Sequence, residues 1–200
     1  MKLPAVPGIT PVSLDSVERT TAELHALMAR LRGPDAARDL GLEAAAVQSA
    51  EIAHDQRAGL LALVEHRDAD PALLIAGVVA VDGPIDEAAA ADLGRFVADR
   101  SPGIREVSSA RTGRGYPVVI VERIGLSGAQ LQAVVLDPDR PRAAVFTLHS
   151  PGGRGWLEVA GLAGTLVAGV DLTPAAPAPG TRAGSGRSPR GTSARSAGRS

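Results

Sequence analysis

The 200-residue chain contains no cysteine. That absence excludes disulfide bridges, thiolate nucleophiles and metal sites with cysteine ligands, and it leaves the redox compartment open. Aromatic residues are almost missing too, because the chain has only two phenylalanines, one tyrosine and one tryptophan. A hydrophobic core must therefore be built from aliphatic side chains, which the 44% hydrophobic composition supplies in sufficient number.

Long apolar runs are also absent from the sequence. No stretch reaches the roughly 18 consecutive apolar residues that a transmembrane helix needs. Residues 1–8 are interrupted by Pro4 and Pro7, so they lack the continuous apolar segment of a signal peptide. We therefore expect a cytoplasmic protein.

Acidic residues are absent from residues 174–200, which hold five arginines. Because the whole chain has 21 basic and 22 acidic residues, the remaining part carries 16 and 22, a net charge of −6. Residues 174–200 also contain no large apolar side chain to bury, which predicts a disordered basic tail. Its charges are sparse and have no interleaved aromatic residues, so the tail gives no strong nucleic-acid signal.

The N-terminal part of the chain divides in two. Residues 1–13 contain Pro4, Pro7, Gly8 and Pro11, which predict an irregular lead-in. In residues 14–57, apolar residues recur at helical spacing and alanine is frequent, while Gly33 and Pro34 interrupt the pattern. We therefore predict two N-terminal helices that form a helical hairpin.

From residue 59 the hydrophobic period changes to that of strands. Apolar runs over 60–64 and 72–81 flank an Asp/Pro turn and predict a β-hairpin, although a long helix through residue 63 competes for the first run. A helix is expected over 84–100 and a closing helix over 156–168. Between them, four short apolar strands separated by turns predict an antiparallel meander; they cover residues 104–110, 117–124, 129–136 and 142–149.

These elements predict an α+β fold with one α/β sandwich domain over residues 59–172. Its antiparallel sheet, a hairpin plus a four-strand meander, would be sandwiched by helices. The phrase over 144–151, with Thr147, Ser150 and Pro151 closing a strand before the last helix, resembles the C-terminal half of actinobacterial Mog1/PsbP-like proteins. The resemblance covers roughly residues 59–172. It implies an α/β/α sandwich and an accessory or partner-binding role without catalytic residues or cofactors, and it leaves the N-terminal helices unexplained.

Three short motifs bear on catalysis or metal binding. Residues 125–129 approach the spacing of a nucleophile elbow around Ser127, but a strand follows where that motif needs a helix, which favours a hairpin turn. Glu51 and His54 share a helix face, yet no second pair is present to complete a metal site. His149 beside Ser150 would need a carboxylate partner to act as a catalytic pair. We therefore expect no enzymatic activity, no metal and no cofactor.

Arginines supply the candidate interaction residues. Four of them lie on or near one predicted hairpin and would form a basic patch facing an acidic partner or a phosphate group, although the interleaved Glu106 and Glu122 favour cross-strand ion pairs instead. A fifth lies in the glycine-rich turn over 150–155, whose backbone N–H groups precede a helix in a way that suits an anion. The five residues are Arg105, Arg111, Arg114, Arg123 and Arg154.

The sequence thus leads to two main functional hypotheses. The first is a non-enzymatic partner-binding or accessory protein whose partner is another protein. The alternative is a small-molecule-binding domain with a pocket between the sheet and the helices, lined by leucine and valine side chains with Phe96 and Phe146. An enzyme with an unrecognised site is the third hypothesis.

Overall fold

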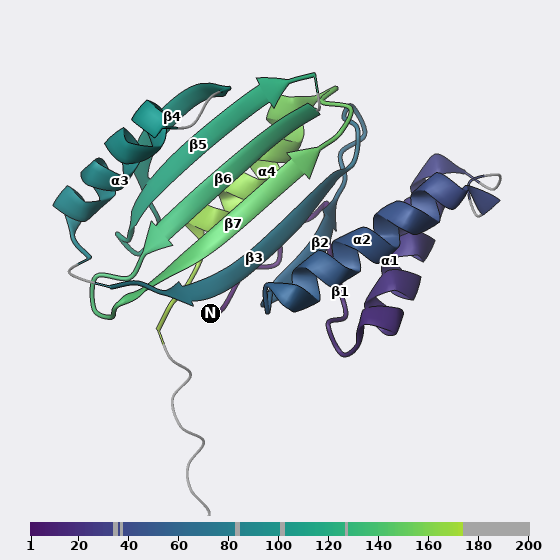
Figure 1. The fold of residues 1–200 in the computed structure, drawn as a ribbon, viewed down its shortest axis with the longest axis horizontal. Helices are drawn as coiled ribbons and strands as arrows, with labels where there is room; N and C mark the ends of the chain where they lie inside the picture. Colours follow the sequence, from purple (N-terminus) through teal and green to yellow (C-terminus); the bar gives the residue numbers. More distant parts are fainter. Residues whose placement is uncertain (34–35, 37, 83–84, 101–102, 127, 174–200) are drawn as a thin grey trace, which may run out of the picture.

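The predicted meander forms one half of a seven-stranded antiparallel sheet in the computed structural model of the chain (Figure 1). The structure describes residues 1–33, 36, 38–82, 85–100, 103–126 and 128–173, so the predicted tail lies outside the described residues. Within them the strands are β1 (Ile9–Val12), β2 (Leu60–Val64), β3 (Ala72–Ala80), β4 (Ile104–Arg111), β5 (Pro117–Gly125), β6 (Gly128–Leu136) and β7 (Arg142–Ser150). Their order across the sheet is β1-β2-β3-β7-β6-β5-β4.

Helices cover both faces of this sheet, which confirms the predicted α+β sandwich. The helices of the described residues are α1 (Val17–Arg32), α2 (Leu40–Asp55), α3 (Glu87–Arg100) and α4 (Trp156–Ala168). Helix α4 lies behind the sheet in the view of Figure 1, and the face it covers is called the α4 face here. Helices α1, α2 and α3 lie on the opposite side, called the front face.

The α4 face carries the main hydrophobic core. Successive strand residues point to opposite faces, so every second residue of β7, including Phe146 and Leu148, is directed toward α4. These side chains are fully buried with Val135 of β6 and with Val159 of α4. The core is aliphatic apart from Phe146, Trp156 and Tyr116, as the composition requires.

The front face is covered at its two sides by separate clusters. On one side, Ala90 and Leu93 of α3 pack against Val119 and Val121 of β5. On the other, the helical pair α1–α2 packs against β2 and the first half of β3; this cluster includes Leu24, Ala46, Ala53, Leu61 and Ile75. The two covers leave the central strands between them, and that gap is described below.

The predicted irregular lead-in over residues 1–13 is wrong for Ile9–Val12, which form strand β1. Strand β1 pairs antiparallel with β2 and places Pro11 opposite Ala62 at the edge of the sheet. An edge strand has one side without a ladder partner, so it tolerates a proline that lacks an N–H donor. The proline content that predicted a loop is therefore compatible with this strand.

The two apolar runs that were predicted as a hairpin form β2 and β3, which rules out the competing long helix through residue 63. Helix α2 ends at Asp55, and Arg57 then adopts a φ of 51°, which turns the chain into β2. No helix in the described part of the chain combines the length and the apolar character needed to cross a membrane.

Candidate functional site

Four of the five candidate arginines are held by carboxylates rather than gathered into a basic patch. Arg105 lies 3.3 Å from Glu122 on the neighbouring strand, the cross-strand pairing that the interleaved acids favour. The other three pair with carboxylates distant in sequence: Arg111 with Glu87 at 2.8 Å, Arg114 with Asp171 at 2.9 Å, and Arg154 with Asp70 at 2.9 Å. The hydrogen bonds from Thr173 to Asp171, with the nearby charge of Arg114, hold the pKa of the Asp171 carboxyl below its ordinary value.

Arg123 differs from the other four. Its side chain is half-buried on the front face, beside Gln130 of β6, and no carboxylate among the described residues forms an ion pair with it. It lines a hollow of about 270 Å³ with Gly103, Gln130 and His149. Arg123 is therefore the candidate arginine whose charge is available for a partner.

The turn over residues 150–155, predicted to suit an anion, already holds a carboxylate of the protein itself. Asp70 accepts hydrogen bonds from the Arg154 backbone at 3.3 Å and from Arg154 Nε at 3.0 Å, and its own N–H donates to Arg154 O at 2.9 Å. A Cβ on Gly152 would overlap the Asp70 carboxylate, so the close approach depends on glycine. The turn thus anchors the β2–β3 connection to the start of α4.

We expect Asp70→Ala to lower the free energy of unfolding by about 1–2 kcal/mol, because it removes charge-assisted hydrogen bonds that are only partly solvated. Asp68→Ala is the matched control, since Asp68 pairs with Arg67 where both side chains are exposed. An exposed pair contributes about 0–1 kcal/mol, so the control should change stability little. Urea denaturation of both variants measures the difference, and equal losses would show that the Asp70 contacts are not an anchor.

The described residues of the candidate catalytic motifs are not brought together in the structure. His149 and Ser150 are consecutive strand residues, so their side chains point to opposite faces, and the buried Ser150 hydroxyl accepts from Gly153 N–H at 3.2 Å. Gly125 pairs with Gly128 across a hairpin turn, which confirms the turn rather than a strand-to-helix elbow. Ser127 itself lies outside the described residues.

The Glu51–His54 pair has a structural explanation as well. Nε2 of His54 lies 3.0 Å from Oγ1 of Thr20, so the imidazole joins α2 to α1. Within the parts of the chain that the structure describes, no three His, Asp or Glu side chains are grouped to hold a metal ion.

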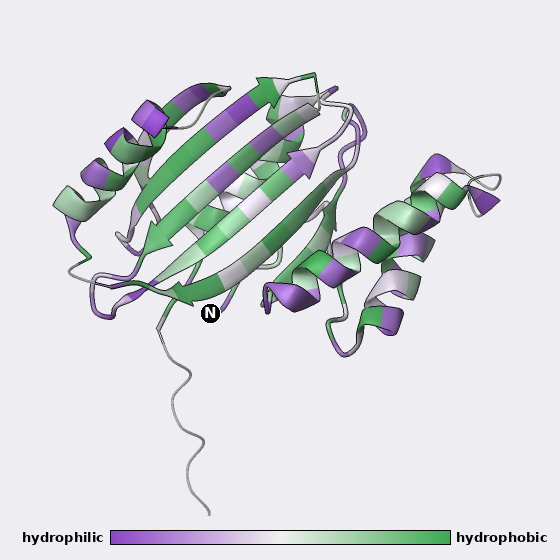
Figure 2. Ribbon diagram, in the orientation of Figure 1, coloured by the Kyte–Doolittle hydropathy of each residue, from purple (hydrophilic) through white to green (hydrophobic). Residues whose placement is uncertain are grey.

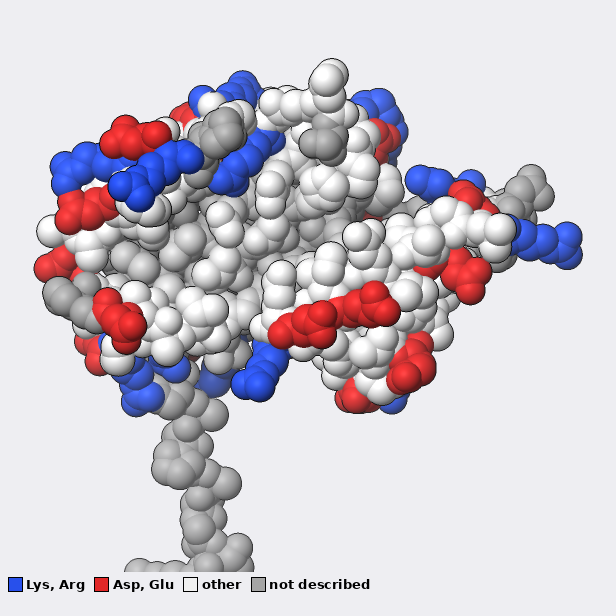
Figure 3. All heavy atoms as spheres, in the orientation of Figure 1, with Lys and Arg blue, Asp and Glu red and all other residues white. Residues whose placement is uncertain are grey.

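The front face instead presents an open groove between α3 and α2, which we call the front groove. Its floor consists of front-face residues of the three central strands: Gly77 and Val79 of β3, Val145 and Thr147 of β7, and Gln132 and Val134 of β6. Of these, Val134 also packs against the cluster under α3. None of these six is buried, and none is charged. Figure 3 shows the floor as an uncharged hollow between the two helical covers.

Exposed apolar side chains line the same groove. Val79 on the floor is 48% exposed, Ile52 on α2 is 39% exposed, and Phe96 on α3 is 56% exposed. Phe96 follows Leu93 by three residues, so the two share a flank of α3, whereas Glu87 on the other flank pairs with Arg111 of the edge strand β4. Phe96 therefore faces the central strands. In Figure 2 the floor strand β3 is hydrophobic over most of its length.

Charges are distributed unevenly along the front groove. Arg123 shares a cross-strand row with Gln130, His149 and Leu73. Helix α3 ends at Arg100, and Ile104 at the start of β4 pairs with Arg123, so the end of α3 lies near this row. The Arg100 guanidinium lies over the ring of Phe96, 4.8 Å from the centroid.

Further along β3, Gly77 lies beside the segment that follows α2, because a Cβ built on Gly77 would be 3.9 Å from Ala58 Cα. Helix α2 carries the exposed Glu51 and Asp55 in its last turns, and neither forms an ion pair with any described residue. The exposed Arg57 follows directly, so the end of α2 carries charges of both signs.

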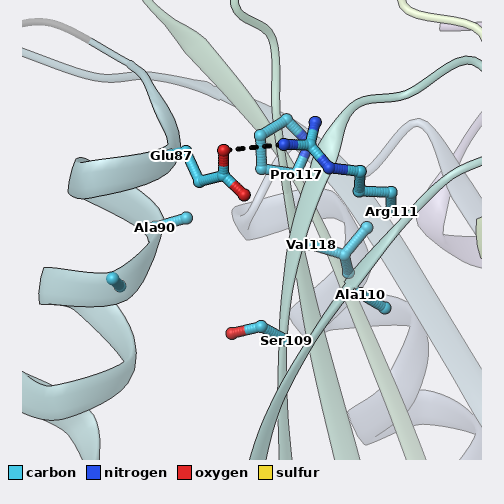
Figure 4. Close-up of a pocket in the computed structure, with 8 residues that line it drawn as sticks. Glu87, Ala90, Ser109, Ala110, Arg111, Pro117 and Val118 are labelled. Atoms are coloured by element: carbon cyan, nitrogen blue, oxygen red, sulfur yellow. Dashed lines mark ion pairs between the residues drawn. The ribbon is translucent and has the colours of Figure 1, made fainter.

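Two hollows among the described residues lie away from the groove centre. The larger, about 380 Å³, lies between α3 and the ends of β4 and β5 (Figure 4). Ala90 and Val118 form part of its apolar wall, and the Glu87–Arg111 ion pair spans its mouth. A single pocket lined by Phe96 and Phe146, as predicted, is wrong, because Phe146 is buried on the α4 face and Phe96 lies on the front face.

Sequence reasoning did not identify the front groove. Its floor residues read as ordinary strand positions, and whether a helix covers them depends on where α2 and α3 dock. The signal that was present is Phe96, a large aromatic residue in a chain with few of them, lying between the charged residues Arg95 and Arg100. Comparisons with protein-family models and with curated proteins found no match to this chain.

Proposed function

We propose that the chain is a non-enzymatic partner-binding protein and that the front groove is where another protein docks. The observation that carries this proposal is the exposure of Phe96, Ile52 and Val79 around one uncharged stretch of sheet. Contiguous apolar surface of this kind marks interaction sites in monomeric proteins. The resemblance to Mog1/PsbP-like proteins supports an accessory role by analogy alone.

The shape of the groove supports a macromolecular partner over a small molecule. Small-molecule sites enclose most of their ligand in pockets of roughly 300–1,000 Å³. The groove is open along the strands, whereas the hollow between α3 and β4–β5, about 380 Å³, falls within that range. Small-molecule binding at the hollow between α3 and β4–β5 remains the alternative proposal, supported by its apolar wall and by the Glu87–Arg111 pair at its mouth.

A photo-crosslinking experiment tests the proposal. A benzophenone amino acid replaces Thr147 on the groove floor in one variant, and in the control it replaces Thr165, which is exposed on α4 at the opposite face. After irradiation in cells, we expect a discrete protein adduct from position 147 and none from position 165. Equal adducts from both positions, or none from position 147, would contradict docking in the groove.

Native mass spectrometry of the purified full chain separates the alternative. Under the docking proposal the chain carries no bound small molecule. A stoichiometric organic ligand whose binding is lost in Ala91→Arg, an exposed residue at the wall of the larger hollow, would favour small-molecule binding instead.

A further inference from the structure

We propose that a hollow at one end of the sheet, which we call the Arg123 hollow, binds the carboxylate of a small organic acid. The hollow, about 270 Å³ in volume, lies where β4 begins and where β5 and β6 meet in a hairpin. We assign the contact with the carboxylate to Arg123 and Gln130. This inference goes beyond the proposed function, because it concerns a second site that does not depend on docking in the front groove.

Strand pairing brings the polar lining of the Arg123 hollow together. Arg123 of β5 lies opposite Gln130 of β6, and Gln130 lies opposite His149 of β7. Residues that pair across an antiparallel sheet point to the same face, and neighbouring strands are about 4.8 Å apart. All three residues line the hollow. A row of side chains that can form hydrogen bonds therefore borders one cavity.

The Arg123 guanidinium has no counter-ion within the described part of the protein. No carboxylate there forms an ion pair with it, and none of the described residues that line the hollow is acidic. Asp99 and Glu106, the acids before and after Gly103 in the sequence, are exposed and do not line the hollow. Because arginine stays charged when it is partly buried, its half-buried guanidinium attracts an anion more strongly than it would in bulk water. This unpaired charge is the observation that carries the inference.

Geometry and charge both favour a carboxylate. The guanidinium fork offers two parallel N–H groups, which match the two oxygens of a carboxylate. The side-chain amide of Gln130, on the adjacent strand, can donate a further hydrogen bond to one of these oxygens. Arg123 is the one permanently charged side chain among the described lining residues, so it balances a single negative charge. A phosphate monoester carries about 1.5–2 negative charges and would leave part of that charge uncompensated.

The size and walls of the hollow suit a short-chain acid. Ile124 and Ala129 supply apolar surface beside the polar row. The volume of about 270 Å³ lies below the roughly 300–1,000 Å³ of sites that hold drug-sized ligands. A Cβ built on Gly103 or Gly125 would meet no atom within 4 Å, so the rim is open to solvent. One ion pair and a few hydrogen bonds give weak binding, so such an acid is lost during purification and is detected by titration.

Titration of the full chain with butyrate, followed by proton–nitrogen NMR at constant ionic strength, tests the inference. We expect saturable shifts of the Arg123 Nε–H signal and of the Gln130 side-chain amide signals. Gln130→Glu places a carboxylate of the protein beside Arg123, so butyrate should bind about 10-fold more weakly. Gln132→Glu is the matched control, because Gln132 lies on the same face of β6 but outside the hollow, and it should change the affinity by less than about 2-fold.

A second pair of variants separates loss of binding from a folding defect at Gln130. Arg123→Gln removes the charge and should weaken binding to the same extent, whereas Arg105→Gln, on the neighbouring strand and already paired with Glu122, should keep it. Shifts that grow linearly without saturation, or equal affinity in Gln130→Glu and the unsubstituted chain, would overturn the inference. Tighter binding of methyl phosphate than of butyrate would overturn the assignment to a carboxylate. Crosslinking from position 147 reports on the front groove and is independent of these results.

Discussion

Val119→Asp is expected to abolish cooperative folding at neutral pH. Val119 is 0% exposed between β5 and α3, among apolar side chains that include Val121 and Ala90. The substitution loses about 1.5–3 kcal/mol of apolar burial and leaves a buried charge without a partner, which adds about 3–5 kcal/mol. The sum is comparable with the whole stability of an ordinary domain, about 5–15 kcal/mol.

Circular dichroism across a thermal ramp measures this effect. Val79→Asp is the matched control, because the same change is made on the same sheet at a residue that is 48% exposed. It should leave a cooperative transition close to that of the unsubstituted chain. A soluble Val119→Asp protein that melts cooperatively near the same temperature would place β5 at the surface and contradict the packing of α3.

Phe146→Ala is expected to lower the free energy of unfolding by about 3–5 kcal/mol, the usual loss when a fully buried aromatic side chain is truncated. Phe146 is 0% exposed and lies on β7, in the middle of the sheet, in the core that α4 covers. Truncation leaves a cavity because the strands on both sides hold their positions through the ladder with β3 and β6.

The other phenylalanine provides the control. Phe96→Ala removes the same side chain where it is 56% exposed, so the free energy of unfolding from urea denaturation should change by no more than about 0.5 kcal/mol. In the docking proposal Phe96→Ala instead weakens partner binding. Equal losses of stability in the two variants would show that Phe96 is packed and that the groove wall is misassigned.

The order of helices and strands could be predicted from the sequence because each depends on local periodicity. The predicted strand over 142–149 and the observed β7, Arg142–Ser150, differ by one residue, and the Asp/Pro turn before Pro71 separates β2 from β3 as expected. Strand β1 was missed because its four residues include Pro11, and only the pairing with β2 makes an extended segment a strand.

The candidate site depends on tertiary contacts between elements distant in sequence, which local sequence patterns do not predict. A cross-strand partner for Arg105 could be anticipated, since Glu122 lies on the adjacent strand of one hairpin. The acids that neutralise Arg111, Arg114 and Arg154 come from other elements and meet them only through the tertiary fold. For the same reason the sequence could not predict that Arg123 lacks an ion pair among the described residues, or that α2 and α3 leave part of the central strands uncovered.

The two ends of the described chain meet on the sheet domain. Lys2 and Asp171 exchange backbone hydrogen bonds of 2.8 and 3.0 Å, so the first and last described parts of the chain lie next to each other. At the tip of the β5–β6 hairpin, Leu126 is fully exposed. A permuted chain that is joined near Lys2 and Asp171 and opened at this tip would keep every ladder of the sheet, since such exposed tips tolerate new termini. The architecture is therefore specified by which strands are neighbours, and the point at which the chain starts is secondary to it.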